Sequence, residues 1–327
     1  MSNTETAPAE VACAPGGTDS PVEVLTPREV PLGGPRAMTV RRTLPQRQRS
    51  LIGAWCFVDH YGPDDTTASG GMDVPPHPHT GLATVSWLFT GEVEHRDSHG
   101  VHAIVRPGEL NLMTGGHGIA HSEVSTPSTT VLHGVQLWVA LPDHARDAPR
   151  DFAHHAPDPV SPTPGATARV FLGRLAGVTS PVRTASPLLG AELLLEPDTR
   201  LVLDVDPAFE HGLLVDRGSV TLQGRALAPA ELGAVPAGPS RLEITADEQA
   251  RVLLLGGPPF GEQIVMWWNF VARTHDEIAA FRADWEAGGE RFGDVPGYVA
   301  RDGRTGDAAR LPAPALPNGA LRPRGNP

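Results

Sequence analysis

Short apolar runs separated by glycine and proline recur along almost the whole chain, and this pattern constrains the fold more than any other feature. Runs with the length of strands rather than helices lie, for example, at residues 51–58, 83–89, 109–113 and 135–141. The last of these alternates, so that Val135, Leu137 and Val139 share one face of an extended chain and Gln136 and Trp138 share the other. The 36 glycines and 34 prolines, about a fifth of the 327 residues, supply the turns between strands. The sequence therefore predicts an all-β protein built as a sandwich or barrel.

The length of the chain predicts two domains, at roughly 150 residues for each. Strand-like runs stop at a polar, proline-rich stretch and resume after it, which indicates a linker between two β domains of similar size. We expect five segments: a disordered N-terminus over 1–22, a first barrel over 23–142, a linker over 143–164, a second barrel with a helix over 165–298, and an extended, proline-rich tail over 299–327.

One helix is predicted near the C-terminus. Thr274 and Glu277 have the spacing of a capping box, in which the threonine caps the helix start and the glutamate reaches back to it. Apolar residues at 278, 281 and 285 form one stripe, so we expect a helix from about 275 to 287 that docks on a barrel. The adjacent Trp267 and Trp268 are interpreted as core packing.

Charge and cysteine content exclude several classes of protein. The 38 acidic and 26 basic residues, all of the latter arginine, give a formal net charge of -12 at pH 7, and such a chain repels nucleic acid in the absence of a dense basic stripe. Two cysteines, Cys13 and Cys56, cannot make a disulfide framework. The sequence has neither an apolar run long enough to span a membrane nor the features of a signal peptide. We therefore expect a cytoplasmic protein that binds neither membranes nor nucleic acid.

The histidines point to a metal site. Of the 14 histidines, 12 lie between residues 60 and 155. His77 and His79 stand two residues apart, on the same face of an extended chain, and His121 and Glu123 repeat this geometry 44 residues later. Three imidazoles and a carboxylate facing into a barrel suit a first-row divalent ion that keeps open positions for water, oxygen or substrate, and residue types alone do not choose among Fe(II), manganese, cobalt and nickel. Five other histidines are expected at the surface or beside the ligands rather than among them: His95, His99, His102, His117 and His133.

Three sequence strings around these dyads resemble the pirin family of the cupin superfamily. They are HPHTGLATVSWLFTGEVEHRDSHG from His77 to Gly100, PGELNLMTGGHGIAHSE from Pro107 to Glu123, and HGVQLWVALP from His133 to Pro142. The resemblance covers the chain from about residue 22 to residue 286. It implies two cupin barrels facing one another (a bicupin), with one metal held in the first barrel by the four dyad residues and no metal in the second. Iron is the usual metal of the family; manganese, cobalt, nickel and zinc are the alternatives.

The resemblance implies two kinds of function. The first is a dioxygenase of the quercetin 2,3-dioxygenase type, in which a flavonol or similar aromatic substrate binds the metal and Glu123 acts as the catalytic group that accepts a proton or orients the bound substrate. The alternative is a non-enzymatic protein that regulates a partner protein according to the oxidation state of its iron. A third reading, a sugar or small-acid isomerase, uses the same scaffold. Many pirins read HPHRGFETV where this chain reads HPHTGLATV, so the mouth of the site differs and the substrate is left open.

Overall fold

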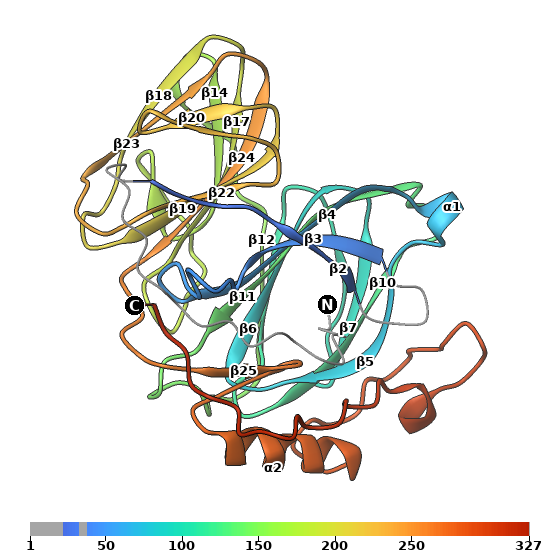
Figure 1. The fold of residues 1–327 in the computed structure, drawn as a ribbon. Helices are drawn as coiled ribbons and strands as arrows, with labels where there is room; N and C mark the ends of the chain where they lie inside the picture. Colours follow the sequence, from blue (N-terminus) through green and yellow to red (C-terminus); the bar gives the residue numbers. More distant parts are fainter. Residues whose placement is uncertain (1–21, 33–37, 327) are drawn as a thin grey trace.

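Two β-barrels make up most of the molecule (Figure 1). The computed structural model describes residues 22–32 and 38–326; most of the expected disordered N-terminus, 1–22, lies outside these residues. Within the described part, each barrel consists of a seven-stranded sheet facing a four-stranded sheet. The predicted all-β class, with two barrels and a C-terminal helix, is confirmed. None of the helices among these residues has the length and apolar character needed to cross a membrane. The cytoplasmic location stays a prediction.

The first barrel contains the sheets β12-β9-β6-β11-β4-β3-β2 and β5-β10-β7-β8. Its strands are β2 (Arg28–Leu32), β3 (Met38–Leu44), β4 (Trp55–Asp65), β5 (Asp73–His79), β6 (Leu82–Thr90), β7 (Val93–Asp97), β8 (His102–Val105), β9 (Leu110–Thr114), β10 (Ile119–Ser125), β11 (Val131–Ala140) and β12 (Asp151–His155), with a short helix α1 (Thr66–Ser69) after β4. All the strand pairings in these two sheets are antiparallel.

The second barrel contains the sheets β1-β22-β19-β24-β17-β14-β13 and β18-β23-β20-β21. Its strands are β1 (Glu23–Leu25), β13 (Val160–Thr163), β14 (Ala166–Leu172), β17 (Leu189–Leu195), β18 (Thr199–Asp204), β19 (Glu210–Arg217), β20 (Val220–Leu222), β21 (Arg225–Leu227), β22 (Leu232–Val235), β23 (Arg241–Ala246) and β24 (Ala250–Gly257). A separate small hairpin is formed by β15 (Arg174–Leu175) and β16 (Val178–Thr179). After β24 the chain continues into the hairpin β25 (Val265–Trp267) and β26 (Phe270–Ala272), the helix α2 (His275–Glu286) and the short 3-10 helix η1 (Gly306–Ala309).

The two faces of β11 serve different parts of the molecule, as their alternation predicts. Val135, Leu137 and Val139 are buried in an apolar cluster shared by the two barrels, which also contains Leu232 and Leu253 of the second barrel. On the opposite face, the ring of Trp138 lies 5.2 Å from the ring of His79 and 4.1 Å from that of Phe57. One strand thus holds the barrels together with one face and lines the interior of the first barrel with the other.

Each end of the described chain packs on the barrel that is distant in sequence. β1 pairs with β22 of the second barrel, although its position in the sequence assigned it to the first. In the opposite sense, the hairpin β25–β26 and α2 lie against the first barrel, where Thr80 forms a bridge with Phe270 (Figure 1). Assigning segments to the nearest barrel in sequence fails here, because adjacency is only the commonest arrangement. The C-terminal segment consequently covers the face of the first barrel that carries the histidine dyads.

The predicted helix and its capping box are confirmed. Thr274 accepts a hydrogen bond from the backbone of Glu277, and the Glu277 side chain accepts one from the backbone of Thr274. Trp285 and Ile278 are buried against Trp267 and Trp268, so the tryptophan pair packs in the core as predicted. Residues 143–164, expected as a linker, instead carry two strands, β12 and β13, one at an edge of each large sheet. No residue of either strand is fully buried, so both strands lack the apolar alternation by which strands are predicted.

His211 is buried in the second barrel, and neither of its ring nitrogens has a hydrogen-bond partner among the described residues. Burial lowers the pKa of His211 to about 4, from an ordinary value of 6.5. Between these two values the unfolded chain binds more protons than the folded chain, so the free energy of unfolding rises with pH in this window. The contribution of His211 to the free energy of unfolding therefore has its full value above pH 6.5 and decreases as the pH falls toward 4.

Replacing His211 with leucine is expected to remove this pH dependence. Between pH 7 and pH 4.5 the wild type should lose about 2.5 kcal/mol relative to His211→Leu, because the variant has no imidazole to protonate. Urea unfolding at the two pH values measures this difference. His144→Leu, which changes an exposed histidine, is the control and should follow the wild type. An equal difference between wild type and His211→Leu at both pH values would contradict the prediction.

Candidate metal centre

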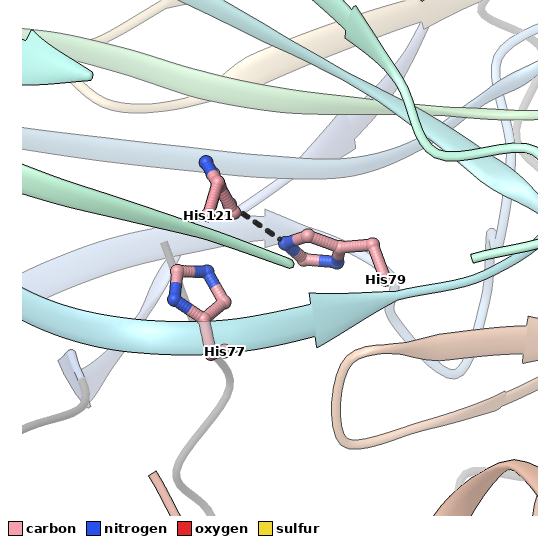
Figure 2. A group of neighbouring side chains, drawn as sticks. All are labelled: His77, His79 and His121. Carbon is pink, nitrogen blue, oxygen red and sulfur yellow. Dashed lines mark hydrogen bonds between the residues drawn. The ribbon is translucent and has the colours of Figure 1, made fainter. Parts of the chain in front are cut away.

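The three predicted histidine ligands meet inside the first barrel. His77 and His79 lie on β5 and His121 lies on β10, and the antiparallel register places His121 opposite His77. All three are completely buried. Their ring nitrogens lie within 4.8 Å of one another, and the Nε2 atoms of His79 and His121 are 3.0 Å apart (Figure 2). The spacing of two residues on each strand, together with this register, brings the imidazoles to one point.

A glycine allows the C-terminal hairpin to close over this strand. Gly81, two residues after His79, has a φ of +65°. A Cβ atom there would lie 2.3 Å from the carbonyl oxygen of Val271 on β26. Glycine thus removes a steric and a conformational obstacle at the same position. The backbone of Val271 then donates a hydrogen bond to the carbonyl of Thr80.

Hydrogen bonds fix which nitrogen of each β5 imidazole faces the centre. The Nδ1 of His77 lies 2.9 Å from the carbonyl oxygen of Pro75, and the Nδ1 of His79 lies 3.1 Å from that of Asn269. A carbonyl oxygen only accepts, so each Nδ1 carries the hydrogen and each Nε2 has a free lone pair. The Nε2 of His77 is buried and has no hydrogen-bond partner among the described residues. Buried nitrogen lone pairs held in this way fit a metal ion.

The electrostatics of the centre favour metal binding over protonation. Burial lowers the pKa of His77, His79 and His121 well below the usual range of an imidazole. At neutral pH the three rings are therefore uncharged, and an uncharged imidazole is the form that binds metals. Three imidazoles suit first-row divalent ions, but their chemistry does not select one of them.

Glu123 lies near the three imidazoles without joining their group. It is buried on β10, two residues after His121, and it is paired in register with His95 of β7. The hydroxyl of Ser86 lies 3.4 Å from its Oε1 and 2.8 Å from Oε1 of Gln136. The carboxylate is not among the ligand atoms that lie within 4.8 Å of one another. Its roles as a ligand and as the catalytic group stay predictions.

The five histidines that the sequence analysis placed at the surface or beside the ligands divide into three kinds. His99 and His102 are exposed, and the half-buried His117 has its Nδ1 3.3 Å from the carbonyl of Ala148. His95 is buried and contacts His121. Of the two alternatives that the sequence offered for this histidine, a position at the surface or one beside the ligands, the structure shows the second. His133 is half-buried and belongs to a different group, between the barrels.

A second group of metal-ligand residues, which the sequence analysis did not predict, joins the two barrels. The Nε2 atoms of His60 and His133 lie 2.7 Å and 2.6 Å from Oδ1 of Asp216 on β19. A guanidinium nitrogen of Arg41 lies 3.4 Å from His60, and one of Arg251 lies 3.3 Å from the other Asp216 oxygen. Arg251 also lies 3.3 Å from the buried carboxylate of Glu192. The two guanidinium groups thus already compensate the carboxylates of this group, and their positive charge opposes the binding of a further cation. We therefore interpret this group as a buried ionic network, which we call the interbarrel network.

Comparison with known proteins agrees with the fold. The family model of pirin matches residues 37–139, and that of the pirin C-terminal cupin domain matches residues 190–293. A protein of Pseudomonas aeruginosa named "Putative quercetin 2,3-dioxygenase" is 45% identical over 293 residues, which cover 90% of each chain. The chain belongs to the pirin family. This confirms the resemblance seen in the dyad strings and the prediction of two cupin barrels.

Two solved structures extend the comparison. The crystal structure of a quercetin 2,3-dioxygenase from Acinetobacter baumannii superposes on this pirin with a TM-score of 0.85 at 39% identity, covering 92% of this chain and 97% of the other. A bacterial pirin from Escherichia coli, solved in complex with nickel(II), has a TM-score of 0.57 at 20% identity and covers 73% of this chain and 99% of its own. The second likeness shows the fold. Metal binding is thus found in a protein of the same fold, and this pirin has a group of histidines that could hold a metal ion.

Proposed function

We propose that this pirin is a metal-dependent dioxygenase that opens the heterocycle of a flavonol such as quercetin, with the metal held by His77, His79, His121 and Glu123. One observation carries the proposal: three buried, uncharged imidazoles aim at one point from two paired strands. Support for the reaction comes from the relatives in Pseudomonas aeruginosa and Acinetobacter baumannii, whose names specify quercetin 2,3-dioxygenase.

Iron(II) is the metal we propose, and manganese, cobalt, nickel and zinc are alternatives that the same nitrogen-rich donors accept. When bound, such an ion supplies Lewis acidity toward a substrate hydroxyl and, for iron, one-electron chemistry with dioxygen. The protein's part is to hold the imidazoles in a single tautomer. For His77 and His79, the carbonyls of Pro75 and Asn269 do this.

Glu123 is the residue we propose to accept the proton of the substrate hydroxyl. Its carboxylate is buried next to the histidines, so a proton taken from substrate is held where water is excluded. Ser86 lies between this carboxylate and Gln136 and limits the orientations of Glu123. The buried ring of Trp138 packs edge-to-face against His79, at 5.2 Å between ring centres, and limits the rotation of that imidazole.

The test is oxygen uptake with loss of flavonol absorbance by iron(II)-reconstituted protein given quercetin, beside a metal-free sample. We expect uptake that depends on the metal and that falls about 100-fold or more in Glu123→Gln, because the amide cannot accept the proton. Glu94→Gln is the matched control, since Glu94 is half-buried and pairs with Arg96 and His102 rather than with the site. Absence of uptake from a demonstrably iron-loaded wild type would overturn flavonol dioxygenation. The hypothesis of a redox-responsive regulator of a partner protein, which stays a prediction, would then be tested next.

A further inference from the structure

The third histidine of the centre is oriented differently from the other two. The Nδ1 atoms of His77 and His79 face neutral backbone carbonyls, whereas the Nδ1 of His121 faces the side chain of His95, which in turn contacts Asp97. We infer that His95 and Asp97 are a positioning pair, which fixes the tautomer of His121 and conveys negative charge to the metal centre. The inference rests on the metal centre of the proposed function.

The pair is built into the sheet that carries the centre. β7 lies next to β10, and the register places Asp97 opposite His121 and His95 opposite Glu123. The Nδ1 atoms of His95 and His121 are 3.5 Å apart, and Nε2 of His95 is 3.0 Å from Oδ2 of Asp97. Asp97 is completely buried and His95 is 4% exposed. The ring of Phe152, on β12, lies 5.0 Å from the ring of His95 and packs against it.

Only one arrangement of hydrogens satisfies this chain when His121 binds a metal through Nε2. The Nδ1 of His121 then carries a hydrogen and donates it to His95. His95 must accept at Nδ1, so its own hydrogen is on Nε2, where it is donated to Asp97. The carboxylate of Asp97 ends the chain as an acceptor. The hydrogen bonds from His121 to His95 and from His95 to Asp97 are therefore consistent with a His121 imidazole whose Nε2 lone pair faces the metal.

The two oxygens of Asp97 have separate partners. Oδ1 accepts hydrogen bonds from the backbone nitrogens of His99 and Val101, at 2.9 Å and 3.0 Å, and so holds the turn after β7. Oδ2 faces His95 instead. A residue that only stabilised the turn would not need this second contact. The turn also fixes the carboxylate in place, so the oxygen that accepts the hydrogen bond from His95 is held in one position.

The physical consequence is a more basic metal ligand. A carboxylate joined through an imidazole increases the electron density on His121, and groups behind metal ligands typically alter metal affinity about 10–100-fold. Added negative charge also stabilises the higher oxidation state of a bound ion relative to the lower. His121 is therefore the ligand through which the protein sets the affinity and the reduction potential of the centre.

The test compares four variants by cobalt(II) titration and by the reduction potential of the iron-loaded protein. Asp97→Asn removes the charge, and His95→Phe keeps a ring against Phe152 but cannot accept from His121. His95→Gln offers an acceptor and a donor in place of the imidazole nitrogens. Glu94→Gln removes a carboxylate from the same strand without touching the chain. Thermal unfolding shows that each variant is folded.

We expect Asp97→Asn and His95→Phe to weaken cobalt binding about 10–100-fold, His95→Gln to lose less, and Glu94→Gln to match the wild type. The potential of the iron centre should become more positive in Asp97→Asn. Unchanged affinity and potential in Asp97→Asn, with a metal-binding wild type, overturn the inference and leave the proposed function standing. A wild type that binds cobalt no better than His121→Ala overturns both. If Asp97→Asn does not fold, the two His95 variants decide the question. Cobalt affinity equal to that of the wild type in both variants overturns the inference. Weaker cobalt binding in His95→Phe alone supports it.

Discussion

Replacing His121 with alanine is expected to abolish stable metal binding while the protein remains folded. His121 is one of three imidazoles that aim at one point. A four-ligand site binds its metal with a free energy of roughly 10–16 kcal/mol, and loss of one ligand's share of it corresponds to a loss of about 100-fold or more in affinity. The fold should persist because the apolar clusters of the barrels do not include His121. Metal content after dialysis measures the loss. Added metal should raise the melting temperature of the wild type and not that of the variant.

The matched control is His99→Ala. His99 lies on the same barrel, in the turn after β7, but its side chain is exposed, so this variant should bind metal as the wild type does. Retention of a full equivalent of metal by His121→Ala would contradict the proposed centre. If that metal were then lost in His133→Ala, the interbarrel network would be the binding site, and our argument from its two arginines would be wrong.

The sequence predicts the parts of the centre that depend on local geometry. His77 and His79 share a face of β5 because side chains alternate along a strand, and the same period relates His121 to Glu123. The split of β11 into a face between the barrels and a face inside the first barrel follows from the same rule. These predictions need only the residues of one strand. The structure agrees with them for the two β5 histidines and for β11, whereas the place of Glu123 among the ligands stays a prediction.

The sequence does not predict contacts that depend on register between distant strands. His60 and Asp216 are 156 residues apart and meet only because the barrels pack face to face. Similarly, β1 joins the second barrel and β26 covers the first, and neither choice is encoded in local periodicity. The contact of His95 with His121 requires the β7–β10 register as well. An HxD pattern opposite a metal dyad, as in His95 and Asp97, is the one local signal that could have indicated it.

Replacing Asp216 with asparagine is expected to cost the folded protein about 3–5 kcal/mol, because it leaves buried positive and polar groups without their carboxylate. Asp216 has a fully buried side chain that faces His60, His133 and Arg251. Burial alone would raise the pKa of Asp216, but hydrogen bonds from the two histidines outweigh it and hold that pKa well below the usual value. The carboxylate therefore stays ionised throughout the neutral and mildly acidic range, and its contribution to the free energy of unfolding is lost progressively as the pH falls below the ordinary aspartate pKa toward the lowered pKa of Asp216.

The interbarrel network should also make the two barrels unfold together. His60 and His133 belong to β4 and β11 of the first barrel, whereas Asp216 belongs to β19 of the second, so Asp216→Asn weakens a link between the barrels. Urea unfolding followed by tryptophan fluorescence should show a lower midpoint. Asp204→Asn is the matched control: its ion pair with Arg241 is 86% and 73% exposed, and loss of such a pair costs about 0–1 kcal/mol. Equal, small losses in both variants would show that the network stabilises no more than an exposed ion pair does, and the barrels would then be held together by their shared apolar cluster alone.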